Sequence, residues 1–84
     1  MGRAQRVVEV VARALVGGPH GFTVKSRPHR GGTLIELVLS QAEFGRVIGR
    51  QGRTATAIRT LAGLAGELDG ERVQVEFLER DNVR

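Results

Sequence analysis

The chain has 84 residues, with 13 Lys and Arg against 9 Asp and Glu, a net charge of +4 and no cysteine. A chain of this length predicts one domain, here residues 1–84 with a flexible tail at 79–84. The lack of cysteine excludes a disulfide framework, a thiolate metal site and a cysteine nucleophile. The apolar run 7–16 is broken by Glu9 and Arg13 and is too short to cross a bilayer, so we expect a cytoplasmic protein.

The positive charge is unevenly distributed. Residues 1–66 hold ten basic and three acidic residues, whereas residues 67–84 hold three basic and six acidic ones. The window 44–66 contains four arginines and no acid: Arg46, Arg50, Arg53 and Arg59. Such a patch attracts polyanions, although a solvated helix face would have the same composition.

The first half of the chain predicts a helix followed by a hairpin. Apolar residues recur at helical spacing over 3–16, with Val7, Val11 and Ala14 inward and Val8 and Leu15 beside them. The sequence Gly-Gly-Pro at 17–19 ends this helix. Residues 22–27 alternate as a short strand. Pro28 to Gly32 predicts a turn in which Gly31 and Gly32 supply positive φ. Residues 33–39 form the next strand, with a pattern typical of a central one.

The second half predicts two helices and a strand. Ser40 and Glu43 form a capping box, S-x-x-E, so a helix begins at Gln41 and runs to about Ile48. A second helix follows Gly52 and ends near residue 66. Its predicted core stripe is Ala55, Ile58, Leu61, Ala62 and Ala65. Residues 72–78 alternate as the last strand. The predicted fold is α+β, a three-stranded sheet with its helices packed on one face.

One short loop concentrates features that suit an anion. Gly49-Arg50-Gln51-Gly52 links the two predicted helices, and glycine at both ends lets a phosphodiester approach the main chain without a Cβ between them. The loop also precedes a helix N-terminus, where free N–H groups and the helix dipole favour negative charge. Arg46, Arg50 and Arg53 add cations to the same place. A tight corner in which the glycines serve packing alone remains the alternative.

Other site types find little support. The Walker A pattern fails because Gly52 is followed by Arg53, and the dinucleotide fingerprint fails because Val47 stands two residues before Gly49. His20 and His29 lie in predicted turns without partners at ligand spacing, so no metal and no cofactor is expected. No catalytic constellation is present, and we expect a protein that is not an enzyme.

The stretch 44–61, FGRVIGRQGRTATAIRTL, resembles the core of KH domains. The whole chain resembles the small bacterial single-KH RNA-binding proteins of the KhpA type. The element order, α-β-β-α-α-β, is that of the type II KH fold, since too few residues follow residue 66 for the type I order. The resemblance implies recognition of about four nucleotides of single-stranded RNA by the G-x-x-G loop.

The resemblance also assigns roles and partners. Gly49 and Gly52 would admit the RNA backbone, side chains of the loop would contact phosphates, and Ile48 would help to form the apolar groove under the bases. The implied RNA-binding residues are Arg46, Ile48, Gly49, Arg50, Gln51, Gly52 and Arg53. It further implies a post-transcriptional regulator or RNA chaperone, a homodimer, and in some bacteria a heterodimer with a larger KH and R3H protein. A protein-interaction module, in which RNA binding is secondary, is the competing hypothesis; no membrane and no small-molecule substrate are expected.

Overall fold

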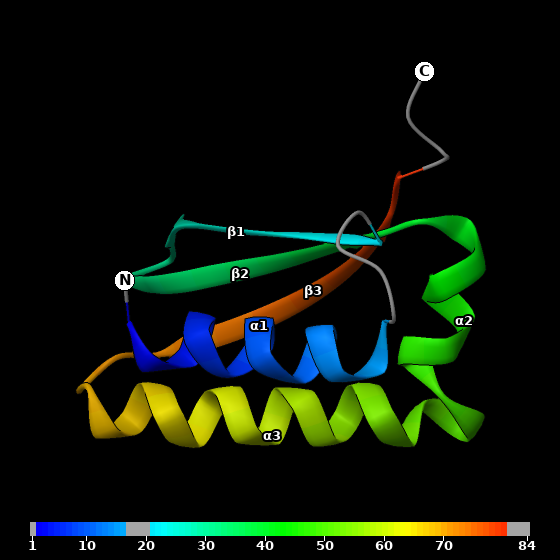
Figure 1. Ribbon diagram of the computed structural model, residues 1–84. Helices are drawn as coiled ribbons and strands as arrows, with labels where there is room; N and C mark the ends of the chain where they lie inside the picture. Colours follow the sequence, from blue (N-terminus) through cyan, green and yellow to red (C-terminus); the bar gives the residue numbers. More distant parts are fainter. Residues whose placement is uncertain (1, 17–20, 81–84) are drawn as a thin grey trace.

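The computed structural model describes residues 2–16 and 21–80, and it confirms the predicted α+β element order. Figure 1 shows the helices packed on one face of the sheet, which leaves the other face uncovered by helices. The elements are α1 (Arg3–Leu15), β1 (Phe22–His29), β2 (Gly32–Leu39), α2 (Gln41–Ile48), a 3-10 turn η1 (Arg50–Gly52), α3 (Arg53–Leu68) and β3 (Val73–Glu79).

The three strands are arranged in the order β1-β2-β3, so the predicted central position of β2 is confirmed. β1 pairs with β2 antiparallel, and β2 pairs with β3 parallel, with Leu37 opposite both Val24 and Phe77. A parallel neighbour requires a long crossover, which α2, η1 and α3 provide. This crossover places the G-x-x-G loop at one end of α3, at the corner where α2 meets α3 (Figure 1).

The hairpin is longer than predicted, and its turn uses different residues. Pro28 belongs to β1, an edge strand where its missing N–H is tolerated, and His29 is the last residue of that strand rather than part of a turn. The positive φ angles are at Arg30 (51°) and Gly31 (78°), as in a two-residue type I′ turn, and not at Gly32. Gly32 is glycine for another reason, because a Cβ there would collide with the Arg72 carbonyl.

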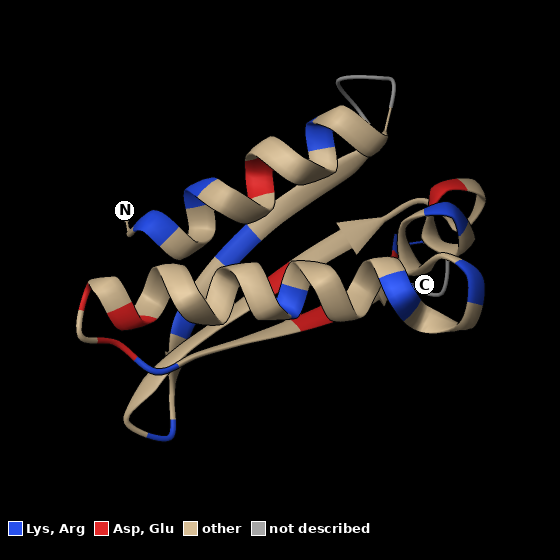
Figure 2. Ribbon diagram, turned by 90° about the horizontal axis from the view of Figure 1, so that it is seen from below, with Lys and Arg blue, Asp and Glu red and all other residues tan. Residues whose placement is uncertain are grey.

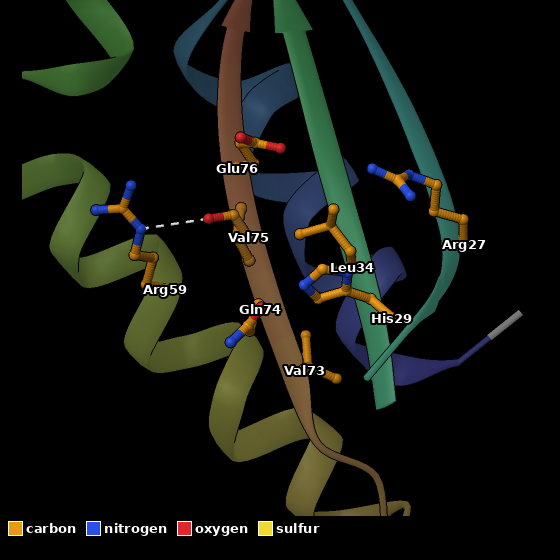
Figure 3. A pocket seen from close by; sticks show the side chains of 8 residues that line it. All are labelled: Arg27, His29, Leu34, Arg59, Val73, Gln74, Val75 and Glu76. Atoms are coloured by element: carbon orange, nitrogen blue, oxygen red, sulfur yellow. Dashed lines mark hydrogen bonds between the residues drawn. The ribbon is translucent and has the colours of Figure 1, made fainter. Parts of the chain in front are cut away.

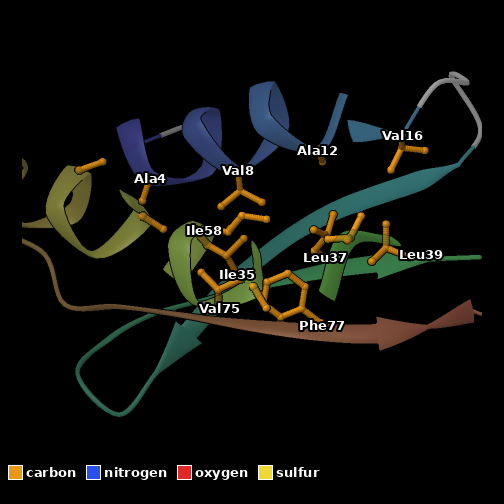
Figure 4. Close-up of a cluster of buried hydrophobic side chains, with 14 residues drawn as sticks. Ala4, Val8, Ala12, Val16, Ile35, Leu37, Leu39, Ile58, Val75 and Phe77 are labelled. Carbon is orange, nitrogen blue, oxygen red and sulfur yellow. The ribbon is translucent and has the colours of Figure 1, made fainter. Parts of the chain in front are cut away.

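The core lies between the helices and the sheet, as Figure 4 shows. From α1 it takes Ala4, Val8 and Ala12. The prediction is confirmed for Val8 and wrong for Ala14, which is exposed. Val7, Val11 and Leu15 are half-buried, so the buried stripe is rotated from the predicted one. The inward side chains of β2 and β3 meet this stripe. The largest fully buried side chains are Ile35, Leu37, Leu39, Ile58, Val8, Val16 and Val47.

Helix α3 buries most of its predicted stripe but not Leu61. Ala55, Ile58, Ala62 and Ala65 are buried, whereas Leu61 is 47% exposed and the prediction for it is wrong. The buried face is centred near Ala62, and at 100° per residue Leu61 lies to one side of it. The helix continues past Gly66 to Leu68.

Three smaller predictions have different outcomes. The capping box is confirmed, since Ser40 is the N-cap of α2 and its side chain accepts a hydrogen bond from the Glu43 N–H. Glu79 belongs to β3, not to the tail, and residues 81–84 lie outside the described residues, as does the Gly-Gly-Pro stop at 17–19. None of the helices in the described ranges has the length and apolar character needed to span a membrane.

Candidate nucleic-acid interface

The G-x-x-G loop has an unusual backbone conformation. Three of its four residues have positive φ: Gly49 (φ 80°, ψ 174°), Gln51 (φ 57°, ψ 24°) and Gly52 (φ 71°, ψ 15°). The Gly49 angles lie in a region that is essentially closed to residues with a side chain, and Gln51 adopts a left-handed conformation that is uncommon for a non-glycine residue. The sharp change of direction between α2 and α3 depends on these angles.

The two glycines serve different purposes. A Cβ on Gly49 would lie 2.5 Å from Thr54 Oγ1 and 2.8 Å from Thr54 Cβ, so the first turn of α3 already occupies that side. A Cβ on Gly52 would meet no described atom within 4 Å. Gly49 therefore closes the loop onto α3, as the packing alternative predicts, while the open backbone surface is at Gly52.

The loop satisfies part of its own backbone. The Gly49 N–H donates to the Gly45 carbonyl (3.0 Å), the Gly52 N–H to the Gly49 carbonyl (3.2 Å), and the Arg53 N–H to the Arg50 carbonyl. The expectation of free N–H groups at the start of α3 is therefore wrong for Gly52 and Arg53. Attraction of an anion has to rely more on the side chains and on the helix dipole.

The predicted cations of the loop differ in their surroundings. Arg50 and Arg53 are exposed, and Arg53 Nη2 donates to Gln51 Oε1 at 3.1 Å, which brings these two side chains together over the loop. Arg46 is also exposed, but its Nη1 lies 3.4 Å from Glu43 Oε1, an acid one residue outside the acid-free window. Arg46 is thus partly neutralised, whereas Arg50 and Arg53 have no acidic partner within residues 2–16 and 21–80.

Apolar side chains border the loop on its α2 side. Ile48, the last residue of α2, is half-buried and packs against the core, as does Phe44 one turn earlier. Val47 between them is fully buried and anchors the helix. Ile48 therefore combines a fixed position with a partly exposed apolar surface next to Gly49.

The charges are segregated along α3. Figure 2 shows basic residues around the corner of α2 and α3 and acidic residues at the opposite end of α3. That acidic end contains Glu67, Asp69 and Glu71, and Asp69 pairs with Arg3 at 3.5 Å. A polyanion approaching this side of the molecule is consequently directed toward the loop.

One contact near the loop was not predicted as part of a site. Arg59 Nε lies 3.4 Å from the Val75 carbonyl oxygen on β3, and the Arg59 guanidinium carbon lies 4.9 Å from the centre of the Phe77 ring. In the sequence Arg59 was only one of four arginines in a basic window. Its spacing of seven residues, or two helical turns, from Gly52 is the one signal that could have singled it out.

Comparisons with known proteins agree with this architecture. Residues 5–77 match the family model described as "KhpA/KhpB, KH domain". The chain is 36% identical over 80 residues to the RNA-binding protein KhpA of Streptomyces coelicolor, covering 95% of this chain and 98% of that protein. It is 38% identical over 79 residues to the RNA-binding protein KhpA of Aquifex aeolicus, covering 94% and 100% of the two chains.

A solved structure shares the fold. The crystal structure of a single-residue variant of Aquifex aeolicus Era bound to GDP.AlF4- superimposes with a TM-score of 0.66 and 23% identity, over 90% of this chain but only 29% of that chain. The relatives that match over nearly their full length are named as RNA-binding proteins and not as enzymes. The family match over residues 5–77, together with these relatives, shows that the chain belongs to the KhpA/KhpB family of KH domains.

Proposed function

We propose that this protein binds short single-stranded RNA through the G-x-x-G loop between α2 and α3, as a post-transcriptional regulator or RNA chaperone. The proposal rests on what lies together at one corner of the molecule. The main chain at Gly52 is open, and Arg50 and Arg53 beside it are exposed and have no acidic partner among the described residues. The names of the relatives support the same class of ligand.

The geometry supports a separate role for each residue of the site. Arg50 and Arg53 contact phosphates, Gln51 orients Arg53 through their hydrogen bond, and the strand lies against the main chain at Gly52. Gly49 shapes the loop, and Ile48 offers an apolar surface to a base. Arg46 contributes less than Arg50, because Glu43 offsets its charge. Binding without aromatic stacking suits a chain with three Phe and no Trp or Tyr.

The test is the double variant Arg50→Asp with Gln51→Asp. It places two acids beside Gly52, and we expect at least about a tenfold loss of affinity for single-stranded RNA at low salt, measured by fluorescence anisotropy. The wild-type affinity should also fall steeply as salt rises. Circular dichroism should show an unchanged fold, because both side chains are exposed.

A matched control separates the loop from overall charge. Arg30→Asp with Arg72→Gln lowers the net charge by the same three units, at exposed positions on the hairpin turn and just before β3. The two variants are compared again at about 0.1 M salt, where the Debye length is about 10 Å; there the control should bind RNA within about twofold of the wild type, while the loop variant should remain weakened. Equal losses in both variants, or no loss in the loop variant, would contradict the clamp.

A second candidate function is assembly. Four large apolar side chains on the outer surface of α1 and α3 are exposed, and we call them the α1–α3 apolar face: Val10 (57%), Leu61 (47%), Leu64 (54%) and Leu68 (73%). Exposed apolar surface on neighbouring helices suits a homodimer or a heterodimer with another RNA-binding protein. Both functions are compatible, because this face is distinct from the loop. A cytoplasmic location, expected from the sequence, is part of the same proposal.

A further inference from the structure

The longest acid-free stretch of the chain lies outside the loop. Residues 10–35 contain no Asp or Glu, and their basic residues are Arg13, Lys25, Arg27 and Arg30. Three of these four belong to the hairpin, with Lys25 and Arg27 in β1 and Arg30 in the turn that follows it. This second concentration of positive charge attracts polyanions by the same physics as the loop, and the loop makes no use of it.

The alternation of β1 directs its cations away from the helices. Phe22 and Val24 pack against the core between the helices and the sheet. Because successive side chains of a strand point to opposite faces, Lys25, Arg27 and His29 point to the face that the described helices leave uncovered (Figure 1). Lys25 and Arg27 are exposed, and His29 is half-buried. Side chains on this face therefore repeat along the edge strand about every 7 Å.

The β1 side chains border a concave surface. A cavity of about 600 Å³ is lined by Arg27, His29 and Leu34 on this face. Figure 3 shows Arg27 and His29 extending from β1 over β2 toward Leu34. Leu34 is only 6% exposed although it points away from the main core, so the neighbouring side chains shield it. The cations thus stand at the rim of a surface with an apolar floor.

The acidic side chains of this face belong to the other two strands. Glu36 of β2 pairs in register with Lys25, and Glu76 of β3 pairs in register with Glu36. Arg27 Nη2 lies 3.5 Å from Glu36 Oε2, but 57% of the Arg27 side chain is exposed against 18% of the Glu36 side chain. Arg27 therefore remains accessible to a second anion. The face is positive along β1 and negative along β3, which favours a polyanion at the β1 edge.

The hairpin turn and the G-x-x-G loop lie at opposite ends of the molecule, whose longest dimension is 34 Å (Figure 1). A KH loop holds about four nucleotides, so only a longer strand can contact both ends at once. We propose that Lys25, Arg27 and Arg30, which we call the β1 row, form a second contact surface for the phosphates of a longer RNA strand. The inference rests on the proposed RNA-binding function and adds to it a dependence on RNA length.

Two linked contacts on one protein have measurable consequences. Once the loop holds a strand, its contact with the β1 row is intramolecular, which raises the affinity for long RNA without changing the affinity for short RNA. Each phosphate that a single strand gives up to a cation contributes about 0.7 to the slope of log affinity against log salt. Binding of long RNA should accordingly depend more steeply on salt than binding of short RNA.

The experiment compares hexauridine with a uridine strand of about 16 nucleotides, four times the footprint of the loop, by fluorescence anisotropy. Lys25→Gln with Arg27→Gln should lower the affinity for the long strand about fivefold and its salt slope by about 1.4. The affinity for hexauridine should stay within about twofold of the wild type, because the loop holds it alone.

A matched control and a second variant test the position of the contact. Arg6→Gln with Arg13→Gln makes the same charge change at exposed positions of α1, on the other side of the sheet. At about 0.1 M salt this control should bind both RNAs within about twofold of the wild type. Arg30→Asp with Arg72→Gln should keep its affinity for hexauridine and lose affinity for the long strand.

Amide NMR signals locate the bound strand directly. The long strand should shift the signals of Lys25, Arg27 and Arg30 together with those of the loop, whereas hexauridine should shift the loop signals alone. Millimolar inorganic phosphate at constant ionic strength should not reverse the shifts in the β1 row. If it does reverse them, and the affinity for the long strand is unchanged, the row binds a free anion and the proposal is wrong.

Failure of this inference can be told apart from failure of the proposed function. Shifts confined to the loop with the long strand would overturn the second contact and leave the clamp in place. Equal losses for both RNAs in the Lys25→Gln and Arg27→Gln variant would do the same, because the row would then act only through the overall charge. Hexauridine binding that is unaffected by the Arg50→Asp and Gln51→Asp variant would overturn the clamp itself.

Discussion

At the scale of single residues, the two glycines of the loop have different roles: Gly49 packs against α3, whereas Gly52 leaves the main chain open to a ligand. Gly49 is constrained twice, by backbone angles closed to other residues and by Thr54 in the space of its absent side chain. Gly52 is constrained only by its left-handed φ, which other residues adopt at a moderate cost. A G-x-x-G motif in a sequence does not distinguish these situations.

The glycines therefore differ in their expected response to alanine. Gly49→Ala should lower the free energy of unfolding by about 2–4 kcal/mol, because it adds both backbone strain and a collision with Thr54. Gly52→Ala should cost only about 1 kcal/mol. Urea denaturation of the two variants side by side checks this, and equal losses would show that the Thr54 contact is unimportant.

At the scale of elements, α2 is a helix of eight residues that has to hold Ile48 and Gly49 in place. So short a helix is marginal by itself, and its position depends on its cap and on the buried Val47. The Ser40 hydroxyl accepts from the Glu43 N–H at 3.4 Å and satisfies one of the otherwise unpaired donors of the first turn. The geometry of the loop thus depends on a contact at the far end of the helix.

Removing this cap gives a prediction for α2. Ser40→Ala should destabilise the protein by about 1 kcal/mol, measured by thermal or urea unfolding. Ser40→Asp should restore most of the loss, since its carboxylate can accept the same hydrogen bond and interacts favourably with the helix dipole. If aspartate is no better than alanine, the hydroxyl has another role.

At the scale of the whole molecule, an 84-residue chain buries a small core and leaves apolar surface exposed. The α1–α3 apolar face borders a pocket of about 380 Å³ between the two helices, lined by Val7, Val11 and Ala65 among others. We propose that a partner covers Leu64 and Leu68, because large exposed apolar surfaces often mark interaction sites.

The prediction at this scale concerns self-association. Sedimentation equilibrium of the wild type should show a dimer, and Leu64→Glu with Leu68→Glu should shift it to a monomer, because charged groups would be buried at the interface. Thr56→Glu, at an exposed position of α3 that lies about 80° around the helix from Leu64 and about 120° from Leu68, should leave the dimer intact, and so should the loop variant. A wild type that stays monomeric at high concentration would contradict assembly through this face.

Much of the architecture follows from local patterns in the sequence. The order of helices and strands, the Ser40 cap and the placement of Gly49 to Gly52 between two helices depend on periodicity and turn chemistry, which act over a few residues. The resemblance to the core of KH domains likewise rests on one local stretch, residues 44–61. The hairpin turn shows the limit of this reasoning, since Arg30 rather than Gly32 adopts the positive φ.

The sequence by itself thus determined the elements, their order and the position of the loop, because these depend on neighbours along the chain. Only the tertiary structure decided that Leu61 faces solvent, that Thr54 occupies the space beside Gly49, and that Arg59 reaches the β3 edge. The physical reason is that these outcomes depend on the angles and distances at which elements pack. The residue pattern of a single strand or helix does not determine those angles and distances.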